Sequence, residues 1–565
     1  MPPYAHRVNG SEGRGTGSEP SPGGPRGGRP GDRPGGRAPW GAAVAGVAAA
    51  GLALAATEVV GVASPATPTL LQVVGNWLVE RFAGSLRDVA VQLFGTNDKR
   101  ALVIGTVLVS LALGAAVGRL ALRRPAAGPV AFSFAAAAGI AAGLTDPIAR
   151  DHPIPVVAAG VAGAVVGAVA LRLLLVRALG PSSGARRAPL VRPGPSGEAG
   201  PDGGTAPARV ARRRMLTWAV TALGISAGSA WFAGALRGRR AAASAAPPVP
   251  LPAAADVAAV PAGSALDAAV PGITPLITSN ADFYRIDTAL DVPRIAADRW
   301  RLRITGLVER EVEHTYRSLL ARELVEVPIT IQCVSNEVGG DLVGTARWRG
   351  VPLAALLDEA RPRPDATQVV GVSADGFTAG FPTRAVTDGR HALVAVGMNG
   401  RPLPAVHGFP ARLVVAGLYG YVSATKWLTE IRLTRLEDFD GFWIPRGWAK
   451  EGPIKTASRI DVPTGSDAVR AGRVVVAGVA WAPARGIRAV QVRVDRGPWR
   501  DADVAPAASD DLWVQWRWSW DATPGTRTLQ VRAVDGTGAL QDGRAAPPAP
   551  DGATGWHTRT VTVRR

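Results

Sequence analysis

The sequence predicts three parts: a membrane anchor of about five transmembrane helices, an α+β domain, and a C-terminal all-β sandwich. Three observations predict this order. Long apolar stretches recur in roughly the first 240 of the 565 residues. Short strand-like and helical runs alternate after residue 262, and from residue 461 regularly spaced strand-like runs are separated by turn residues.

The anchor follows a segment with almost no large apolar side chain. Residues 1–38 are mostly Gly, Pro, Arg and Ser, so we expect a disordered tail. Crossing a hydrocarbon core of about 30 Å takes about 20 helical residues. Five stretches are long enough: Trp40–Val62, Ala101–Leu122, Ala126–Leu144, Ile154–Val176 and Met215–Leu236. Leu70–Phe94 is apolar too, but charges recur through it, which predicts an interfacial amphipathic helix.

Basic residues predict the orientation of the anchor. Residues 1–262 hold 26 Lys and Arg against 12 Asp and Glu, and residues 263–565 hold 37 against 33. Arginines collect in the tail and in the loops before the third and fifth stretches, so these segments are expected in the cytoplasm. An odd number of spans then places residues 237–565 outside the cell membrane. Their small net charge indicates no basic face for nucleic acid.

The loop before the fifth stretch allows two interpretations. Arg212-Arg213-Arg214 stands directly before a mildly apolar run and resembles a twin-arginine signal, whose pathway exports proteins already folded around a cofactor. The same arginines are equally explained as charges that hold the loop on the cytoplasmic side.

The second half begins after an Ala/Pro linker at 241–262. Residues 263–460 are expected to form the α+β domain, with helices at Tyr316–Arg322 and Leu353–Glu359 and strands at Trp300–Ile304, Pro328–Val334, Gln368–Ser373, Arg412–Ala416 and Trp427–Leu433. Residues 461–565 are expected to form the sandwich, with strands at Arg473–Ala480, Ala489–Asp495, Trp513–Trp520, Thr528–Val534 and His557–Val563. Trp516, Trp518 and Trp520 fall on one strand face, which predicts a packed core or a dimer surface.

Cys333 is the only cysteine in the chain. A disulfide, a Cys-only zinc site, an iron-sulfur cluster with thiolate ligands and a C-x-x-C-H haem site are therefore excluded. An apolar strand runs into the polar loop that contains Cys333, which places the thiol where a metal or ligand can approach. A small buried hydrophobe is the alternative interpretation.

A cationic cluster follows in the segment from His407 to Trp427. His407, Arg412 and Lys426 stand beside small residues that allow close backbone approach. A guanidinium, an ammonium and an imidazole together suit a phosphate. Charges scattered over the surface of a β meander are the alternative.

Both segments belong to a longer series of motifs that resembles a known family. The series is Asn280-Ala-Asp-Phe-Tyr284-Arg285, then Cys333, Trp348-Arg-Gly-Val-Pro-Leu, Met398-Asn-Gly-Arg-Pro-Leu-Pro, His407-Gly-x-Pro-x-Arg412 and Lys426-Trp427. It resembles the molybdopterin-binding domain of the sulfite oxidase family. The region from 461 on is similar to that family's immunoglobulin-like dimerisation domain, whereas the anchor is not part of the common pattern.

The resemblance implies a Mo-molybdopterin cofactor and assigns roles to particular residues. Cys333 would be the thiolate ligand of molybdenum and the catalytic residue, beside the dithiolene of the pterin. Three cations would hold the pterin phosphate: His407, Arg412 and Lys426. Five further residues would line the pterin or the metal pocket: Asn280, Tyr284, Arg285, Ser373 and Thr425.

Two departures from the family pattern concern the substrate. Sulfite oxidases proper have Ala-Gly-Asn-Arg-Arg after the cysteine, and an arginine there helps to bind sulfite. This chain has Val-Ser-Asn336-Glu337-Val338. An expected catalytic tyrosine is replaced by Val396. Two-electron oxo transfer on a small oxyanion or on an S-oxide or N-oxide is therefore expected, with neither class preferred and the direction of electron flow left open.

Electrons must also reach or leave the site. None of the six histidines lies in an expected span, which excludes a membrane haem held by a histidine pair. A separate redox partner, a cytochrome or a quinone-linked protein, is therefore expected, and a homodimer through the C-terminal domain is implied by the resemblance. A binding or scaffold module without cofactor is the alternative function. A transporter is disfavoured because the spans lack paired charges.

Overall fold

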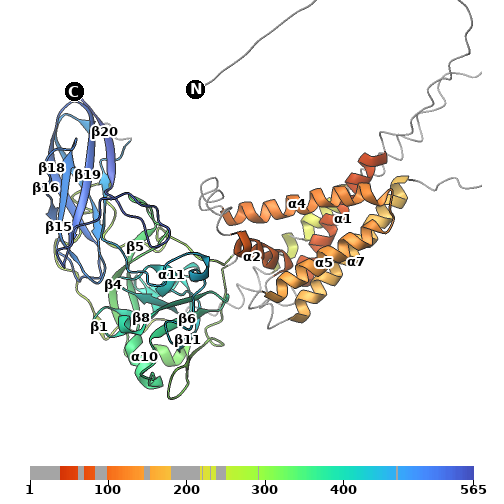
Figure 1. Cartoon of the computed structure of the whole chain (residues 1–565), viewed down its shortest axis with the longest axis horizontal. Helices are drawn as coiled ribbons and strands as arrows, with labels where there is room; N and C mark the ends of the chain where they lie inside the picture. The colour runs from red at the N-terminus through yellow and green to blue at the C-terminus, as the bar shows by residue number, and fades with distance from the viewer. Residues whose placement is uncertain are drawn as a thin grey trace, which may run out of the picture.

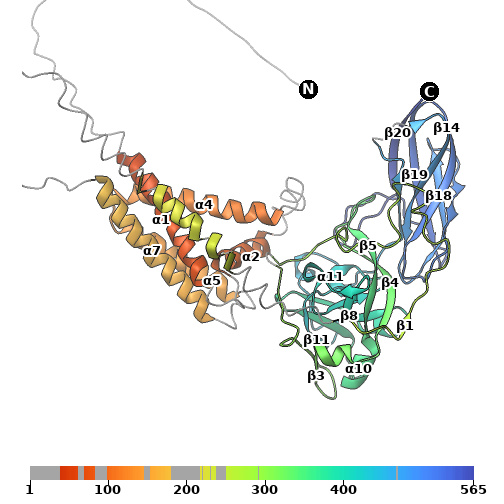
Figure 2. The ribbon, with the colours of Figure 1, turned by 180° about the vertical axis from the view of Figure 1, so that it is seen from behind.

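The computed structural model describes residues 38–61, 69–82, 98–145, 153–179, 250–289, 292–465 and 469–565, and 217–236 except 219, 230 and 234. The labelled helices of the N-terminal region gather at one end and the strands at the other (Figure 1; from behind in Figure 2). The expected tail, apart from Ala38, and the Arg212–Arg214 run lie outside the described residues.

The N-terminal helices are α1 (Ala38–Gly61), α2 (Leu70–Phe82), α4 (Asp98–Ala121), α5 (Ala127–Thr145) and α7 (Pro153–Leu179). Within the described residues, the helices long and apolar enough to cross a membrane number four: Trp40–Gly61, Leu102–Ala121, Ala127–Thr145 and Pro153–Arg177. They coincide with the first four expected stretches. The fifth, Met215–Leu236, lies partly outside the described residues. Within it Val220–Ala233 is a shorter apolar helix, so a count of five spans stays a prediction.

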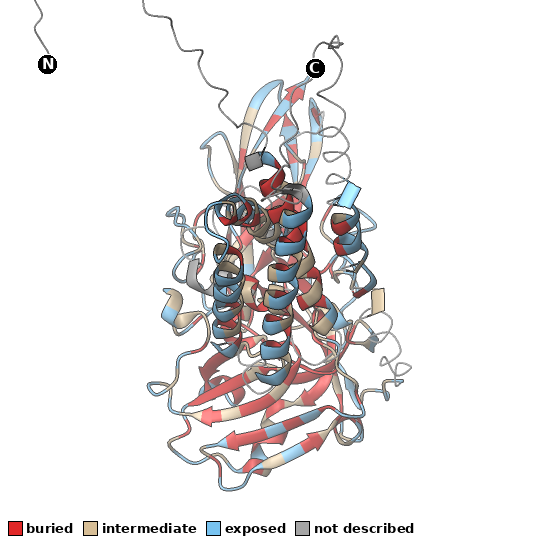
Figure 3. Ribbon diagram, turned by 90° about the vertical axis from the view of Figure 1, so that its right-hand side faces the viewer, coloured by how far each residue is buried: buried red, intermediate tan, exposed pale blue. Residues whose placement is uncertain are grey.

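The long helices expose large apolar side chains. Ile104, Leu108 and Leu113 of α4 are 59%, 60% and 61% exposed. In Figure 3 the helices nearest the viewer carry long exposed faces. Such faces are unfavourable in water and favourable in hydrocarbon, so the helices are compatible with a membrane anchor.

Glycines bring α1 and α4 into backbone contact. A Cβ added to Gly118 would lie 2.0 Å from the carbonyl oxygen of Ala42, and one added to Gly46 would lie 2.0 Å from the carbonyl oxygen of Gly114. Small residues at such positions allow transmembrane helices to pack closely.

Gly118→Val is therefore expected to separate α1 from α4 and to lower the thermal stability of the detergent-solubilised protein. Gly105→Val is the matched control on the same helix, because a Cβ there meets nothing within 4 Å. The measurement is the fraction of protein that stays soluble on heating. Equal loss in both variants would contradict the close packing.

The middle of the chain forms two sheets. The first has the order β1-β4-β5-β8-β10, with β9 paired to β8, and contains β1 (Asp256–Val257), β4 (Val325–Gln332), β5 (Val343–Pro352), β8 (Ala392–Met398), β9 (Arg401–Pro402) and β10 (Arg412–Val415). The second has the order β3-β2-β11-β6-β7 and contains β2 (Arg301–Gly306), β3 (Val312–Thr315), β6 (Gln368–Ser373), β7 (Thr378–Pro382) and β11 (Leu428–Thr434).

Short helices connect these strands: α9 (Tyr316–Leu320), α10 (Leu353–Ala360), α11 (Gly420–Ser423), and the 3₁₀ turns η2 (Thr383–Val386), η3 (Ala405–His407) and η4 (Ile444–Arg446). One apolar core joins the two sheets, with Ile304 and Ile431 from the second packed in the same cluster as Val394 and Leu413 from the first. Other buried residues of the first sheet, among them Ile329 and Trp348, form a second apolar cluster. This sheet is thus a rigid base on which the ends of β4 and β10 can hold side chains.

The C-terminal part is a sandwich of two sheets. One has the order β12-β14-β18-β17 and the other β13-β20-β19-β15-β16. Their strands are β12 (Ala457–Val462), β13 (Val469–Arg470), β14 (Gly472–Trp481), β15 (Ile487–Val494), β16 (Arg500–Asp501), β17 (Asp503–Val504), β18 (Val514–Ala522), β19 (Gly525–Asp535) and β20 (Thr558–Arg564). Trp516 and Trp520 are buried between the sheets and Trp518 packs against the same core, so this tryptophan face is a packed core. An immunoglobulin-like topology stays a prediction.

The structure places strands across two expected boundaries. β1 lies within the range expected as a linker, where Asp256 and Val257 pair in parallel with Val325 and Glu326 of β4. β12 begins before residue 461 and pairs with β14 of the sandwich. In both places backbone hydrogen bonds to a neighbouring sheet edge decide the structure, which local composition does not indicate.

Candidate active site

Cys333 stands at the first position after β4, as the strand-to-loop pattern predicts. Its amide donates to the carbonyl of Leu342 at 2.9 Å, and its carbonyl accepts from the amide of Asn336 at 3.1 Å. The side-chain oxygen of Asn336 accepts from the amide of Leu342 at 2.8 Å. These bonds close the loop at 333–342, so the largely buried thiol has a defined position at the sheet edge.

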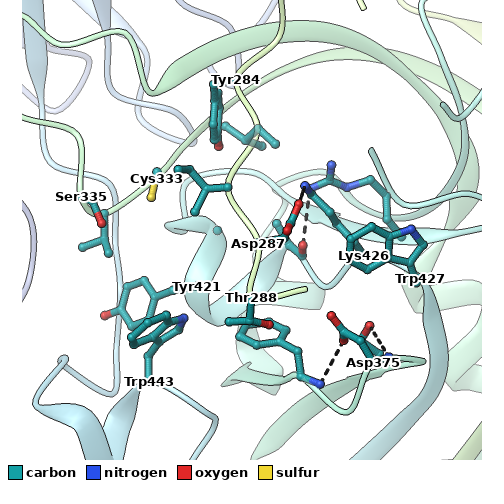
Figure 4. A pocket seen from close by; sticks show the side chains of 18 of the residues that line it. Tyr284, Asp287, Thr288, Cys333, Ser335, Asp375, Tyr421, Lys426, Trp427 and Trp443 are labelled. Atoms are coloured by element: carbon teal, nitrogen blue, oxygen red, sulfur yellow. Dashed lines mark hydrogen bonds and ion pairs between the residues drawn. The ribbon is translucent and has the colours of Figure 1, made fainter. Parts of the chain in front are cut away.

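The thiol lines a cleft of about 860 Å³, a volume that includes its open mouth. Figure 4 shows Cys333 and Ser335 at one side of this cleft and Lys426, Trp427 and Asp375 at the other. The remaining walls are mostly apolar or aromatic and include Phe283, Tyr284, Ile331, Val334, Phe377, Tyr421, Trp443 and Trp448. A cleft of this size and lining can take a cofactor-sized molecule.

Arg412 is the most deeply buried cation of the cleft. Its guanidinium lies 4.9 Å from the ring centre of Trp348. Nη1 donates to the carbonyl of His407 at 3.1 Å and Nη2 to that of Ala424 at 3.4 Å. Burial lowers the pKa of Arg412 to about 10, so the group stays charged at neutral pH. Within the part of the chain that the structure describes, its hydrogen bonds reach carbonyl oxygens, and no carboxylate there pairs with its charge.

Lys426 lies beside a carboxylate that the sequence analysis did not single out. Its Nζ donates to Oδ2 of Asp287 at 3.0 Å and to the carbonyl of Val406 at 3.1 Å. Nε of Arg285 donates to the same Oδ2 at 3.0 Å. Burial lowers the pKa of Lys426 to about 8, and Asp287 opposes that shift. Two cations thus share one carboxylate.

His407 is buried at the end of η3, and its carbonyl oxygen accepts the hydrogen bond from Nη1 of Arg412. Its Nε2 lies 3.0 Å from the carbonyl oxygen of Asn280, which can only accept, so Nε2 carries the proton. Nδ1 is buried without a hydrogen-bond partner. Burial and the neighbouring Arg412 and Lys426 lower the pKa of His407 to about 4. An anion nearby would reverse that shift and allow Nδ1 to donate.

The other expected site residues fall into two groups. Tyr284 and Ser373 line the cleft together with Cys333, Arg412 and Lys426. Burial raises the pKa of Tyr284, so its phenol is neutral. Four are not among the lining residues: Asn280, Arg285, His407 and Thr425.

Asn280 and Thr425 make hydrogen bonds that hold the backbone around the cleft. Asn280 Oδ1 accepts from Nδ2 of Asn399 at 2.7 Å, and its own Nδ2 donates to the carbonyl of Met398 at 3.2 Å. Thr425 is fully buried, and its hydroxyl donates to the carbonyl of Gly371 at 3.4 Å. Both side chains therefore position the walls of the cleft.

Several lining residues were not predicted from the sequence: Asp287, Asp375, Tyr421, Trp443 and Trp448. Asp375 sits in the β6–β7 turn, where Oδ1 accepts from the amide of Phe377 at 3.1 Å. Burial raises its pKa. Asp287 follows the Asn280–Arg285 motif by two residues. Its closeness to that motif was the one feature of the sequence that could have indicated a place in the site. The aromatic residues gave none, because isolated tryptophans read equally well as core.

Of the residues at the two departures from the family pattern, Val334 and Ser335 line the cleft, whereas Glu337 and Val396 do not. Glu337 is exposed in the Cys333 loop, and Val396 is fully buried in the core. Neither is among the residues that line the cleft. The anionic Glu337 is therefore not part of the wall beside the thiol.

The donor set fits molybdopterin. Among the described residues, no three His, Cys, Asp or Glu come together as a metal site, so a metal beside Cys333 needs ligands brought by a cofactor. A soft thiolate suits molybdenum. The uncompensated Arg412, with Lys426 and the unpartnered Nδ1 of His407, suits a phosphate.

Comparisons with known proteins point to the same cofactor. Residues 289–443 match the family model for the oxidoreductase molybdopterin binding domain. The mitochondrial sulfite oxidase of Rattus norvegicus is 29% identical over 321 residues, which cover 48% of this chain and 58% of that protein. The uncharacterized oxidoreductase YuiH of Bacillus subtilis is 31% identical over 154 residues, which cover 27% of this chain and 74% of that protein.

A solved structure, the sulfane dehydrogenase SoxCD from Paracoccus pantotrophus, aligns over 51% of this chain and 84% of that chain, at 23% identity and a TM-score of 0.45. The sequence relatives and the matched domain define the class: the chain is a molybdopterin-dependent oxidoreductase with a Mo-molybdopterin cofactor. Within that class it belongs to the sulfite oxidase family. It spans 58% of the length of the rat sulfite oxidase that it matches.

Proposed function

We propose that this protein is a membrane-anchored, extracytoplasmic oxidoreductase in which Cys333 ligates molybdenum during two-electron oxo transfer. The observation that carries the proposal is the cleft itself, which joins the only thiol of the chain to a buried guanidinium that no carboxylate among the described residues pairs with. The cofactor supplies the oxo-transfer chemistry when it is bound. The chain binds it, orients it and excludes water around it.

Arg412, Lys426 and His407 would hold the pterin phosphate. Arg412 offers a fork, Lys426 a point charge, and His407 a donor at Nδ1 once an anion raises its pKa. Tyr284 and Ser373 would contact the pterin or the metal pocket, because both line the cleft. Asn280, Arg285 and Thr425 would support the site without lining the cleft. Asn280 would orient His407 through its carbonyl, Arg285 would orient Asp287, and Thr425 would hold the wall at Gly371.

The lining of the cleft favours a neutral substrate. Its cations among the described lining residues are Arg412 and Lys426, and both are assigned to the phosphate. Ile331 of β4 and Val334, the residue after the thiol, line the same cleft, and so do Tyr421 and Trp443. A dianion there would lose its water without gaining a free cation. An S-oxide or N-oxide with an apolar substituent fits this wall better, and oxidation of a small oxyanion is the second candidate.

The purified protein is therefore expected to reduce methyl phenyl sulfoxide to the sulfide and water, with two electrons from a reduced viologen dye and two protons from solvent. We expect kcat/KM for this sulfoxide to exceed that for sulfite, measured with ferricyanide as acceptor, by at least about tenfold, the effect of one missing charge-assisted contact. Trp443→Ala is expected to raise KM for the sulfoxide. Faster turnover of sulfite would favour the second candidate.

The location of the protein follows from its anchor. The described apolar helices suit a bilayer, and the arginine-rich loops favour a cytoplasmic N-terminus with the catalytic domain outside. A twin-arginine signal at Arg212–Arg213 would export that domain already folded around its cofactor. A cytochrome or a quinone-linked membrane protein would exchange electrons with it. A homodimer through an immunoglobulin-like C-terminal domain completes the proposal.

The binding module without cofactor, which the sequence alone left open as an alternative, makes a different prediction about metal content. The two functions are separated by molybdenum and pterin analysis of the full-length protein purified in detergent. About one molybdenum per chain is expected for the oxidoreductase, and absence of both from protein made in molybdenum-replete cells would favour the binding module.

A further inference from the structure

The strand that ends at Cys333 has one edge that its own sheet covers only in part. β1 pairs with β4 at Val325 and Glu326 alone. Beyond that point the edge of β4 meets the loop before β18 of the C-terminal sandwich. The amide of Thr330 donates to the carbonyl of Asp511 at 2.9 Å, and the hydroxyl of Thr330 accepts from the amide of Trp513 at 2.7 Å. The sandwich thus continues the hydrogen bonding that β1 leaves incomplete.

A second contact lies directly beside the thiol. Gln332 is the residue before Cys333, and its Oε1 accepts from Nε1 of Trp481 at 2.7 Å. Gln332 is 5% exposed and Trp481 is 1% exposed, so water does not compete for this bond. Trp481, at the end of β14, belongs to the same apolar core as the catalytic sheets. This part of the sandwich is built into the catalytic domain.

The loop after the thiol is held by a third group. Arg459 of β12 donates from Nη1 to the carbonyl of Gly340 at 2.7 Å, and its Nε donates to Oδ1 of Asp461 at 2.7 Å. The ring of His557 packs against Gly339, where an added Cβ would lie 2.4 Å from Cδ2 of the imidazole. Gly339 has φ of +81°, which favours glycine. The loop therefore rests on the sandwich with no space between them.

We infer that the C-terminal sandwich positions the Cys333 thiol, with Trp481 and Arg459 as positioning residues on either side of it. Trp481 holds the residue before the thiol, and Arg459 holds the loop that leaves it. This role goes beyond the dimer contact implied for the sandwich by the family resemblance. The inference rests on the proposed function only in so far as the thiol is a ligand.

Ordinary domain packing makes a different prediction. If these bonds merely add stability, their loss should affect the thiol no more than any equally destabilising change in the sandwich. If they position the thiol, their loss should free Cys333 out of proportion to the stability lost, because local opening then occurs at the loop itself.

The single cysteine makes this distinction measurable. In the full-length holoenzyme, alkylation by iodoacetamide at the chain's thiol reports on Cys333 alone. Trp481→Phe removes the indole donor and keeps an aromatic ring. Trp520→Phe is the matched control, since Trp520 is 6% exposed and packs in the core of the same sandwich away from β4. We expect alkylation at least about tenfold faster in Trp481→Phe, and within about twofold of wild type in Trp520→Phe, at comparable loss of melting temperature.

Arg459→Lys is a second variant, which keeps the positive charge but cannot reach Gly340, Asp461 and Thr274 together. It too is expected to speed alkylation, and it decides the question if Trp481→Phe does not fold. Alkylation rates equal to that of Trp520→Phe in both variants would overturn the positioning role. The comparison of alkylation rates tests the positioning role in either case, with or without a metal on the thiol. Ligation of the metal is tested separately, by the molybdenum content of Cys333→Ser.

Discussion

Cys333→Ser is expected to reduce turnover at least about 100-fold, more than the loss typical for a residue that only orients a metal ligand. The substitution replaces a soft sulfur donor by a hard oxygen at the only cysteine of the chain, so no neighbouring thiol can substitute for it. The fold should survive, because the two side chains have similar size and the loop around Cys333 is closed by backbone and Asn336 hydrogen bonds. Molybdenum content, dye-linked turnover and melting temperature are the measurements.

The matched control is Val338→Ala. Val338 lies in the same loop, is 38% exposed and does not line the cleft. We expect this variant to keep wild-type molybdenum content and turnover. Turnover of Cys333→Ser equal to that of Val338→Ala would show that the thiol is not a ligand, and the proposed mechanism would then be wrong.

The sequence predicted the elements whose signal is local. A helix that crosses a membrane needs a long apolar run, and four such runs recur as α1, α4, α5 and α7. β6 has the ends that its alternation and flanking turns indicate. β8 and β5 were missed for opposite reasons. Every residue of β8 is buried, so its pattern does not alternate, and β5 carries two arginines and a bulge before Gly350.

The candidate site divides in the same way. The thiol of Cys333, the imidazole of His407, the guanidinium of Arg412 and the ammonium of Lys426 are chemically distinctive and stand in recognisable motifs. Asp287 is not distinctive, because an acid two residues from Arg285 reads as a surface ion pair. The structure instead buries it against Lys426, which lies 139 residues further along the chain. Such pairing depends on the tertiary fold alone.

The contacts around Cys333 illustrate that limit most clearly. Gln332 and Trp481 are separated by 149 residues and belong to regions that differ in composition and in expected fold. Each looks like an ordinary buried residue in its own strand. Their side chains meet because the tertiary fold brings the ends of β4 and β14 together, and no pattern in either segment indicates that contact. Domain boundaries drawn from composition therefore separated residues that act on the same loop.

Arg412→Ala is expected to weaken retention of the pterin cofactor by about 1.5 to 3 kcal/mol, which corresponds to about 10- to 150-fold in affinity. Arg412 is 3% exposed, its guanidinium lies over the ring of Trp348, and its hydrogen-bond partners among the described residues are carbonyl oxygens. In the proposed site the pterin phosphate would balance its charge, and Arg412 would be the forked donor to it, since the other cation among the described lining residues is Lys426. Pterin released from the purified variant, measured by fluorescence per mole of protein, gives the occupancy.

Two further variants make this result specific. Arg496→Ala removes an exposed arginine of the sandwich and is expected to keep the wild-type pterin content. Arg412→Lys keeps the charge but not the fork, so its occupancy should fall between those of wild type and Arg412→Ala. If Arg412→Ala holds as much pterin as Arg496→Ala, the guanidinium does not bind the phosphate. The buried charge beside Trp348 would then need another anion, and Asp287, which already binds Lys426, would be the first residue to examine by substitution to Asn.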